Sequence, residues 1–89
     1  MTLDEYQAAA LQTASPDVDL MYALAKLCIE AGEALQLHCK EYYHGKSYDW
    51  REMQEELGDV LWYVALAARE RGLSLEAIAD RNIAKLRAR

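Results

Sequence analysis

Two pairs of acidic residues repeat one spacing in this chain of 89 residues. Glu30 and Glu33 form the first pair. Glu56 and Asp59 form the second, which starts 26 positions later (56 − 30). In a helix, residues three apart lie on one face with their Cβ atoms about 5–6 Å apart. Each pair therefore predicts two carboxylates that project together from one side of a helix.

Apolar residues surround both pairs on these helix faces. At about 100° per residue, the residues within about 60° of Glu30 or Glu56 are Ala23, Leu27, Ala34, Leu37, Met53, Val60 and Tyr63. Acids are rarely buried unless they are paired or bound to metal. Carboxylates brought together also repel one another and raise their pKa values. A positive group is therefore expected among them.

The donor atoms indicate which positive group fits. Four carboxylates offer only oxygen, which suits Mg²⁺, Mn²⁺ or Ca²⁺. A di-iron bundle needs Glu-x-x-His on two helices, and positions 33 and 59 hold Glu and Asp instead. Two structural readings stay open beside the metal site. Lys26 could neutralise the acids in a buried ion-pair cluster, or the acids could form a solvated face.

Helix caps predict the elements that position these acids. Polar residues that can cap the start of a helix occur at four places: Thr2 with Glu5, Ser15 before Pro16, Asp49 with Glu52, and Ser74. Gly45 and Gly72 mark C-terminal stops. The expected helices cover residues 3–13, 16–43, 50–71 and 75 onwards, and no segment has the period-2 alternation of a strand. The expected fold class is all-α.

The two acidic pairs are symmetric about the step between His44 and Gly45, where the turn is expected. An antiparallel helical hairpin folded there brings the pairs level with each other. The stretch Val60–Ala68 is apolar on every side of its helix, which is typical of a fully buried helix. So short a chain can hardly cover it. We therefore expect one domain over residues 1–89, a bundle of about four helices completed by homo-oligomerisation as a dimer or a dimer of dimers.

The charge balance argues against several partners. Fifteen acids against ten bases leave a net charge of −5 and no basic patch, so neither a nucleic acid nor an anionic membrane is expected as a partner. No apolar stretch reaches the 18 residues of a membrane span, and the N-terminus lacks the features of a signal peptide. Cys28 and Cys39 are expected as reduced thiols. These features favour a cytoplasmic protein.

Three segments carry a resemblance to a known family. They are Glu55–Tyr63 (Glu-Glu-Leu-Gly-Asp-Val-Leu-Trp-Tyr), the opening Leu3–Gln7, and the closing Asn82–Arg89. Together with the two acidic pairs, they resemble the MazG-like all-α nucleoside triphosphate pyrophosphohydrolases over nearly the whole chain. The resemblance implies cleavage of a ribo- or deoxyribonucleoside triphosphate between its α and β phosphates. The products would be a monophosphate and pyrophosphate, in house-cleaning of the nucleotide pool.

The resemblance also implies roles for particular residues. Glu30, Glu33, Glu56 and Asp59 would be the catalytic carboxylates and the ligands of Mg²⁺, with Mn²⁺ as a substitute. Asn82, Lys85 and Arg89 would contact the substrate. One carboxylate would orient the attacking water, and Glu33 is our choice. The family further implies that a second subunit helps to build the pocket.

Two alternative functions stay open. One is a pyrophosphatase that prefers dUTP or dCTP, for which the same four acids would serve. The other is a catalytically silent helical dimerisation or regulatory module, whose acids would pair with Lys26, Lys40 or Lys85. Aromatic residues could stack on a base or cover the hairpin end and the subunit interface; these are Tyr42, Tyr43, Tyr48 and Trp50 near the turn, and Trp62 further along the chain.

Overall fold

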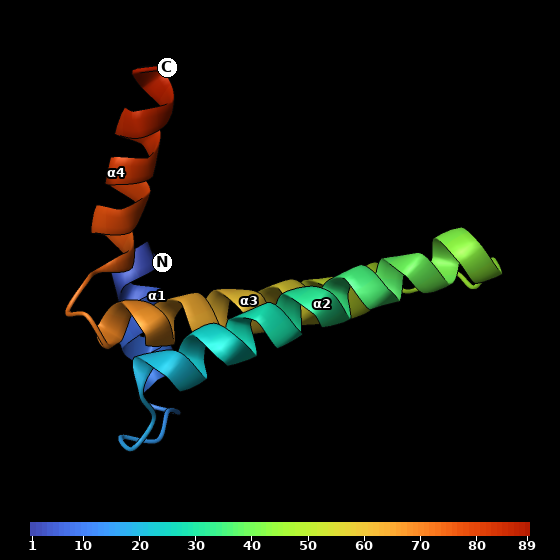
Figure 1. The fold of residues 1–89 in the computed structure, drawn as a ribbon, viewed down its shortest axis with the longest axis horizontal. Coiled ribbons are helices and arrows are strands. Elements are labelled where there is room, and N and C mark those ends of the chain that lie inside the picture. Colours follow the sequence, from blue (N-terminus) through green and yellow to red (C-terminus); the bar gives the residue numbers. More distant parts are fainter.

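The structure is a computed structural model that describes residues 1–89 as four helices without a strand (Figure 1). The helices are α1 (Leu3–Leu11), α2 (Leu20–His44), α3 (Trp50–Arg69) and α4 (Leu75–Arg87). The expected all-α fold is thus confirmed. No helix combines the length and the apolar character that crossing a membrane requires.

Side-chain caps begin three of the helices where the sequence predicts them. The Thr2 hydroxyl accepts a hydrogen bond from the Glu5 amide at 3.0 Å, and the Glu5 carboxylate accepts one from the Thr2 amide at 2.7 Å. Asp49 caps α3 by accepting from the Arg51 amide. Ser74 caps α4 by accepting from the Ala77 amide. These bonds satisfy amides that have no partner inside their own helix.

The predicted start of the second helix at Ser15-Pro16 is wrong. α2 begins at Leu20, and its N-cap is Asp19, whose carboxylate accepts from the Tyr22 amide at 2.8 Å. Ser15 instead accepts from the Asp17 amide within the preceding turn. Two polar caps compete in this segment. A carboxylate is the stronger acceptor beside the positive end of a helix, which favours Asp19.

α2 and α3 form the predicted antiparallel hairpin, which dominates the molecule (Figure 1). Gly45 ends α2 with a φ of +66°, a left-handed conformation that glycine adopts without a steric cost. The chain's radius of gyration is 15.0 Å, against about 12 Å for a compact domain of this length. The hairpin therefore extends well beyond any core that the chain itself could build.

The small core lies at the end of the hairpin opposite Gly45. Ala65 and Ala68 of α3 pack there with Leu75 of α4, and Tyr6 of α1 lies against them. Only 8 of the 89 residues are buried. Within Val60–Ala68, only Ala65, Leu66 and Ala68 are buried in the single chain. Most of the apolar surface of the hairpin is thus open.

Candidate metal centre

The hairpin brings acids from both helices together, as their symmetric spacing predicts. Carboxylate oxygens of Glu30 and Glu33 on α2 and of Glu56 on α3 all lie within 4.8 Å of one another. Glu30 is 9% exposed and Glu56 is half-buried, whereas Glu33 is exposed. Three oxygens at this separation can share one cation. Asp59 lies outside this group and lines the adjoining pocket with Glu30.

Two of these oxygens lack the partners that buried polar atoms normally have. Oε2 of Glu30 and Oε2 of Glu56 are buried without a hydrogen bond. Burial raises the pKa of Glu30, and the neighbouring carboxylates of Glu33 and Asp59 raise it further. Burial also raises the pKa of Glu56, again with Glu33 and Asp59 adding to it. The centre is therefore short of positive charge, which a bound cation would supply.

Lys26 provides part of that charge. Its Nζ atom lies 3.9 Å from Oε1 of Glu30, one helical turn away on α2, and offsets a small part of the rise in the pKa of that carboxyl. The same ammonium stands 5.8 Å from the centre of the Tyr63 ring. Lys26 is the one base within ion-pair distance of any of the four acids. The ion pair that the silent-module alternative requires thus exists, but it leaves the Oε2 atoms unpaired.

A pocket of about 320 Å³ adjoins the carboxylates. Its lining consists of Glu30, Asp59, Trp62 and Tyr63. Burial raises the pKa of Tyr63, and Tyr22, Glu30 and Asp59 raise it further. Because a raised pKa keeps the phenol protonated, Tyr63 stays a hydrogen-bond donor among acceptors. The pocket therefore has an acidic wall and an aromatic wall.

Of the aromatic residues around the acids, Trp62 was predicted as a possible contact for a base, whereas Tyr63 and Tyr6 were not predicted as part of the site. Tyr63 lies four residues after Asp59 on α3, so helical spacing alone could have signalled it. Tyr6 comes from α1, and the nearby Asp59 adds to the rise that burial causes in its pKa. No local pattern links Tyr6 to the acids. Trp62 donates from its indole nitrogen to Thr13 Oγ1 at 3.0 Å and to Ala10 O at 3.2 Å, which anchors α1 beside the pocket.

The predicted substrate contacts lie elsewhere in the chain. Asn82 and Lys85 line a shallow pocket with Ile78 and Arg81, all on α4. Arg89 is the exposed last residue. Figure 1 shows α4 pointing away from both helices of the hairpin. The single chain therefore does not bring these residues to the carboxylates.

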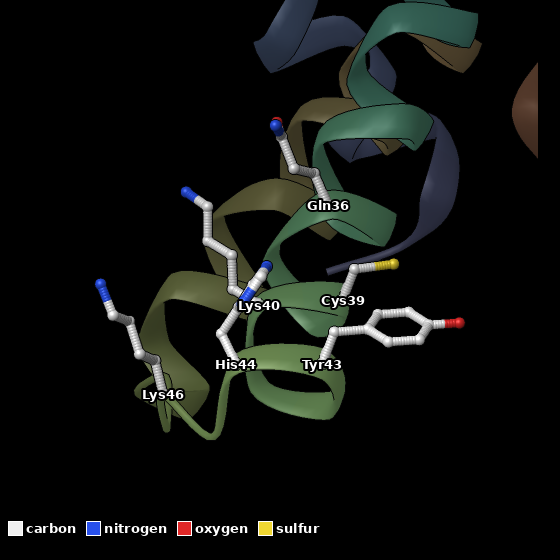
Figure 2. A pocket seen from close by; sticks show the side chains of 6 residues that line it. All are labelled: Gln36, Cys39, Lys40, Tyr43, His44 and Lys46. Atoms are coloured by element: carbon white, nitrogen blue, oxygen red, sulfur yellow. The ribbon is translucent and has the colours of Figure 1, made fainter.

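The largest pocket of the chain contains no acid. It measures about 1070 Å³ and lies at the C-terminal end of α2, at the tip of the hairpin. Figure 2 shows Lys40 and Lys46 extending past His44 on one side, with Cys39 and Tyr43 on the other. Cations at this end complement the negative pole of α2, so a stabilising role for the helix explains their presence.

The aromatic residues near the turn lie at this tip. Tyr42 and Tyr43 are about three-quarters exposed, as is Trp50. His38 Nδ1 is 3.0 Å from the Tyr48 hydroxyl, and Tyr48 meets Trp50 edge to face. They therefore surround the hairpin end, and the aromatic walls nearest the carboxylates are Trp62 and Tyr63.

Sequence comparisons define the class of protein to which this site belongs. Residues 19–89 match the MazG nucleotide pyrophosphohydrolase domain, and the chain belongs to that family. Over 102 aligned positions the chain is also 35% identical to the Gene 37 protein of Mycobacterium phage L5, and the alignment covers 100% of this chain and 89% of the phage protein. No solved structure matches the chain. Family membership supports a nucleotide pyrophosphohydrolase activity.

Proposed function

We propose that this protein hydrolyses nucleoside triphosphates to the monophosphate and pyrophosphate, with Mg²⁺ held by Glu30, Glu33, Glu56 and Asp59. The observation that carries the proposal is the set of three carboxylates within 4.8 Å, two of which have a buried oxygen without a partner. An unpaired buried acceptor is costly, so such a set favours a bound cation. Membership in a pyrophosphohydrolase family supports the choice of reaction.

The donor set fits Mg²⁺. All four side chains are carboxylates, and Mg²⁺ prefers oxygen ligands while keeping several waters and binding substrate phosphates. Mn²⁺ is expected to substitute, because it accepts the same ligands. When bound, such an ion supplies charge neutralisation for a polyphosphate and lowers the pKa of coordinated water.

Residues of the chain itself would orient the attacking water, bind the substrate and exclude bulk water. Glu33 is the exposed acid among the three clustered carboxylates, so its carboxylate is placed to accept a hydrogen bond from the attacking water. The Tyr63 hydroxyl is a donor beside Asp59, suited to a phosphate or sugar oxygen. Trp62 and Tyr63 form the apolar side of the pocket, which helps to exclude bulk water. Reactions at phosphorus depend mainly on this positioning and charge stabilisation.

The proposed enzyme is a homo-oligomer whose α4 serves the site of a second copy. Residues 81–89 contain four bases and no acid, whereas the hairpin centre is acidic. Exposed apolar residues also form a stripe with heptad-like spacing along α2, which consists of Met21, Leu24, Cys28, Ala31 and Leu35. A shorter stripe on α3 consists of Leu57 and Leu61. Stripes of this period are typical of packed helix pairs. Charge complementarity and these stripes support a second copy as the partner.

The activity test is pyrophosphate release from eight ribo- and deoxyribonucleoside triphosphates, with Mg²⁺ and with EDTA. We expect release that requires the metal, and the rank order reports the preferred base and sugar.

Glu56→Gln should lower kcat more than about 100-fold. Glu55→Gln, one residue away on α3, is the matched control and should stay close to the wild type. No release by folded wild-type protein would favour the silent module.

Mixed oligomers test whether α4 acts across subunits. At triphosphate concentrations far below KM, Glu56→Gln and Lys85→Ala are each expected to have little activity alone, Glu56→Gln through its lower kcat and Lys85→Ala through weaker binding of the substrate phosphates. In a mixed dimer, a site built across subunits would combine the intact Glu56 of one copy with the intact Lys85 of the other. Random mixing should then recover up to about a quarter of wild-type activity. Mixed dimers verified by native mass spectrometry that show no recovery would contradict the trans arrangement.

A further inference from the structure

The first turn of α4 is capped mainly by another helix. Its first three amides each donate to a different side chain: Leu75 to Gln7 Oε1 at 3.1 Å, Glu76 to Asp4 Oδ1 at 3.1 Å, and Ala77 to Ser74 Oγ at 3.0 Å. Gln7 and Asp4 both belong to α1. The amides at a helix start usually bond to a local cap or to water. Here two of them tie α4 to residues that lie about 70 positions earlier in the chain.

The connection also runs in the opposite direction. The Glu76 carboxylate accepts from the Asp4 amide at 3.4 Å, so each helix caps the start of the other. Gln7 is 8% exposed, and its Nε2 donates to Leu73 O at 3.1 Å and to Ala65 O at 3.3 Å. One side-chain amide thus joins α3, the α3–α4 turn and the first residue of α4. We name this group of bonds around Asp4, Gln7 and Glu76 the α1–α4 joint.

Beyond the joint, α4 has no support within the chain. Leu75 is 4% exposed, whereas every residue from 80 to 89 is exposed. Lys85 lies ten residues past Leu75, which is ~15 Å along the helix axis. A tilt of about 15° at the joint would move Lys85 by about 4 Å at that length. The bonds made by α1 therefore set where the cationic end of α4 points (Figure 1).

We propose that α1 is the positioning element of α4, and that Gln7 and Asp4 direct the cationic face of α4 towards the phosphates of a substrate bound at the site of a second copy. These two residues act through α4 and do not touch the reacting atoms. The inference rests on the proposed function, because it assigns Lys85 to substrate phosphates. It also gives a role to α1, which lies before the matched residues 19–89.

Two pairs of variants test the joint in the full chain. Gln7→Met keeps the volume of the side chain and removes all three of its hydrogen bonds, whereas Gln7→Glu keeps an acceptor for the Leu75 amide. Asp4→Ala removes the exposed side of the joint, and Asp4→Asn restores an acceptor oxygen. Thr2→Val is the matched control, since it breaks the cap of α1 itself without touching α4.

Two readouts separate positioning from stability. The first is steady-state kinetics with the best triphosphate of the panel. We expect Gln7→Met to raise KM about tenfold, because loss of one well-placed contact between a cationic side chain and a phosphate weakens binding by about that factor. The kcat of this variant should stay within about twofold of the wild type. The second is the set of residual dipolar couplings of the α3 and α4 amides, which report the direction of α4 relative to α3. Only variants that break the joint should change that direction.

The outcomes decide between the two roles. A raised KM and a changed α4 direction in Gln7→Met and Asp4→Ala, with recovery in Asp4→Asn, support the inference. Unchanged couplings in both variants would overturn it. Equal changes in KM and kcat that also occur in Thr2→Val would overturn it as well, because they would report general destabilisation. If the wild type hydrolyses no triphosphate, the proposed function fails, and the couplings alone still decide whether α1 directs α4.

Discussion

Oε2 of Glu30 and Oε2 of Glu56 are buried on facing helices of the hairpin, and neither has a hydrogen-bond partner. Each lies among acceptors without a donor, and burial raises the pKa of both carboxyls. Without a metal, ionisation of these groups opposes folding, because like charges are brought together in a poorly solvated place. A metal ion would turn the same arrangement into a source of stability. The stability of the metal-free protein and that of the metal-bound protein should therefore depend on pH in opposite ways.

At the scale of the residue, we predict how stability without metal depends on pH. A carboxyl whose pKa is raised above its unfolded value of 4.5 stabilises the fold fully below that value. This contribution is lost as the pH rises through the folded pKa. In EDTA, the stability of the wild type relative to Glu56→Gln should therefore fall as the pH rises above about 4.5. Urea unfolding at fixed protein concentration measures this difference.

Addition of Mg²⁺ at neutral pH provides the complementary measurement. The metal should stabilise the wild type against urea and stabilise Glu56→Gln much less, because binding to the native state raises its stability by mass action. Glu55→Gln should respond like the wild type. A stability difference that is independent of both pH and Mg²⁺ would argue that the carboxylates only form surface ion pairs.

Among the elements, the hairpin turn depends on one glycine. Gly45 has a φ of +66°, and nothing lies within 4 Å of the place that a Cβ atom would take. Space is therefore no obstacle to a side chain there, and only the backbone conformation selects glycine. Gly32 and Gly58 also face open space within the chain, from regular helix positions between the acids of each pair. This leaves room behind the acidic centre for a helix of another copy.

At the scale of the element, we predict that Gly45→Ala destabilises the hairpin by about 1 kcal/mol, the cost of a side chain in the left-handed region. Gly45→Asn should cost less, because asparagine tolerates that conformation. Urea denaturation followed by circular dichroism measures both. Affinity for Mg²⁺, measured by calorimetry, should be unchanged, since the turn is far along α2 from Glu30 and Glu33. Equal stability of Gly45→Ala and the wild type would contradict this account of the turn.

The whole molecule lacks a core large enough for its apolar content. Hydrophobic residues make up 53% of the chain, yet 8 of 89 residues are buried. Leu35 and Leu57 on the two stripes of the hairpin are 64% and 55% exposed. Exposed patches of this kind mark association surfaces. Packing of two hairpins against each other would complete a bundle of the expected type.

At the scale of the whole molecule, we predict that Cys28 is protected in solution. Its side chain is exposed in the single chain and lies within the α2 stripe. If a second copy covers that stripe, a thiol reagent should modify Cys28 slowly in the native protein and rapidly in urea. Leu35→Glu should expose Cys28 and shift the sedimentation coefficient towards that of a monomer. Rapid native modification of Cys28 would exclude this stripe as the interface.

The sequence by itself determined the features that depend on neighbouring residues. Thr2, Asp49 and Ser74 cap helices where their polar side chains predict, because a cap acts on amides two or three positions away. The symmetric spacing of the acidic pairs about the His44–Gly45 step was sufficient to bring Glu33 level with Glu56 and Glu30 level with Asp59, because an antiparallel hairpin maps equal distances from the turn onto one level. The four-helix, all-α fold follows from the same local rules.

Only the tertiary structure decided the features that depend on distant contacts. The direction of α4 follows from hydrogen bonds between residues 68 and 72 positions apart, which no local pattern encodes. The approach of Tyr6 to Asp59 likewise needs α1 to fold back on α3. The start of α2 at Asp19 was a competition between two plausible caps, and small differences in acceptor strength decide such competitions. Helix and cap formation depends on interactions between residues a few positions apart, whereas the placement of one helix against another depends on packing and hydrogen bonds across the whole chain.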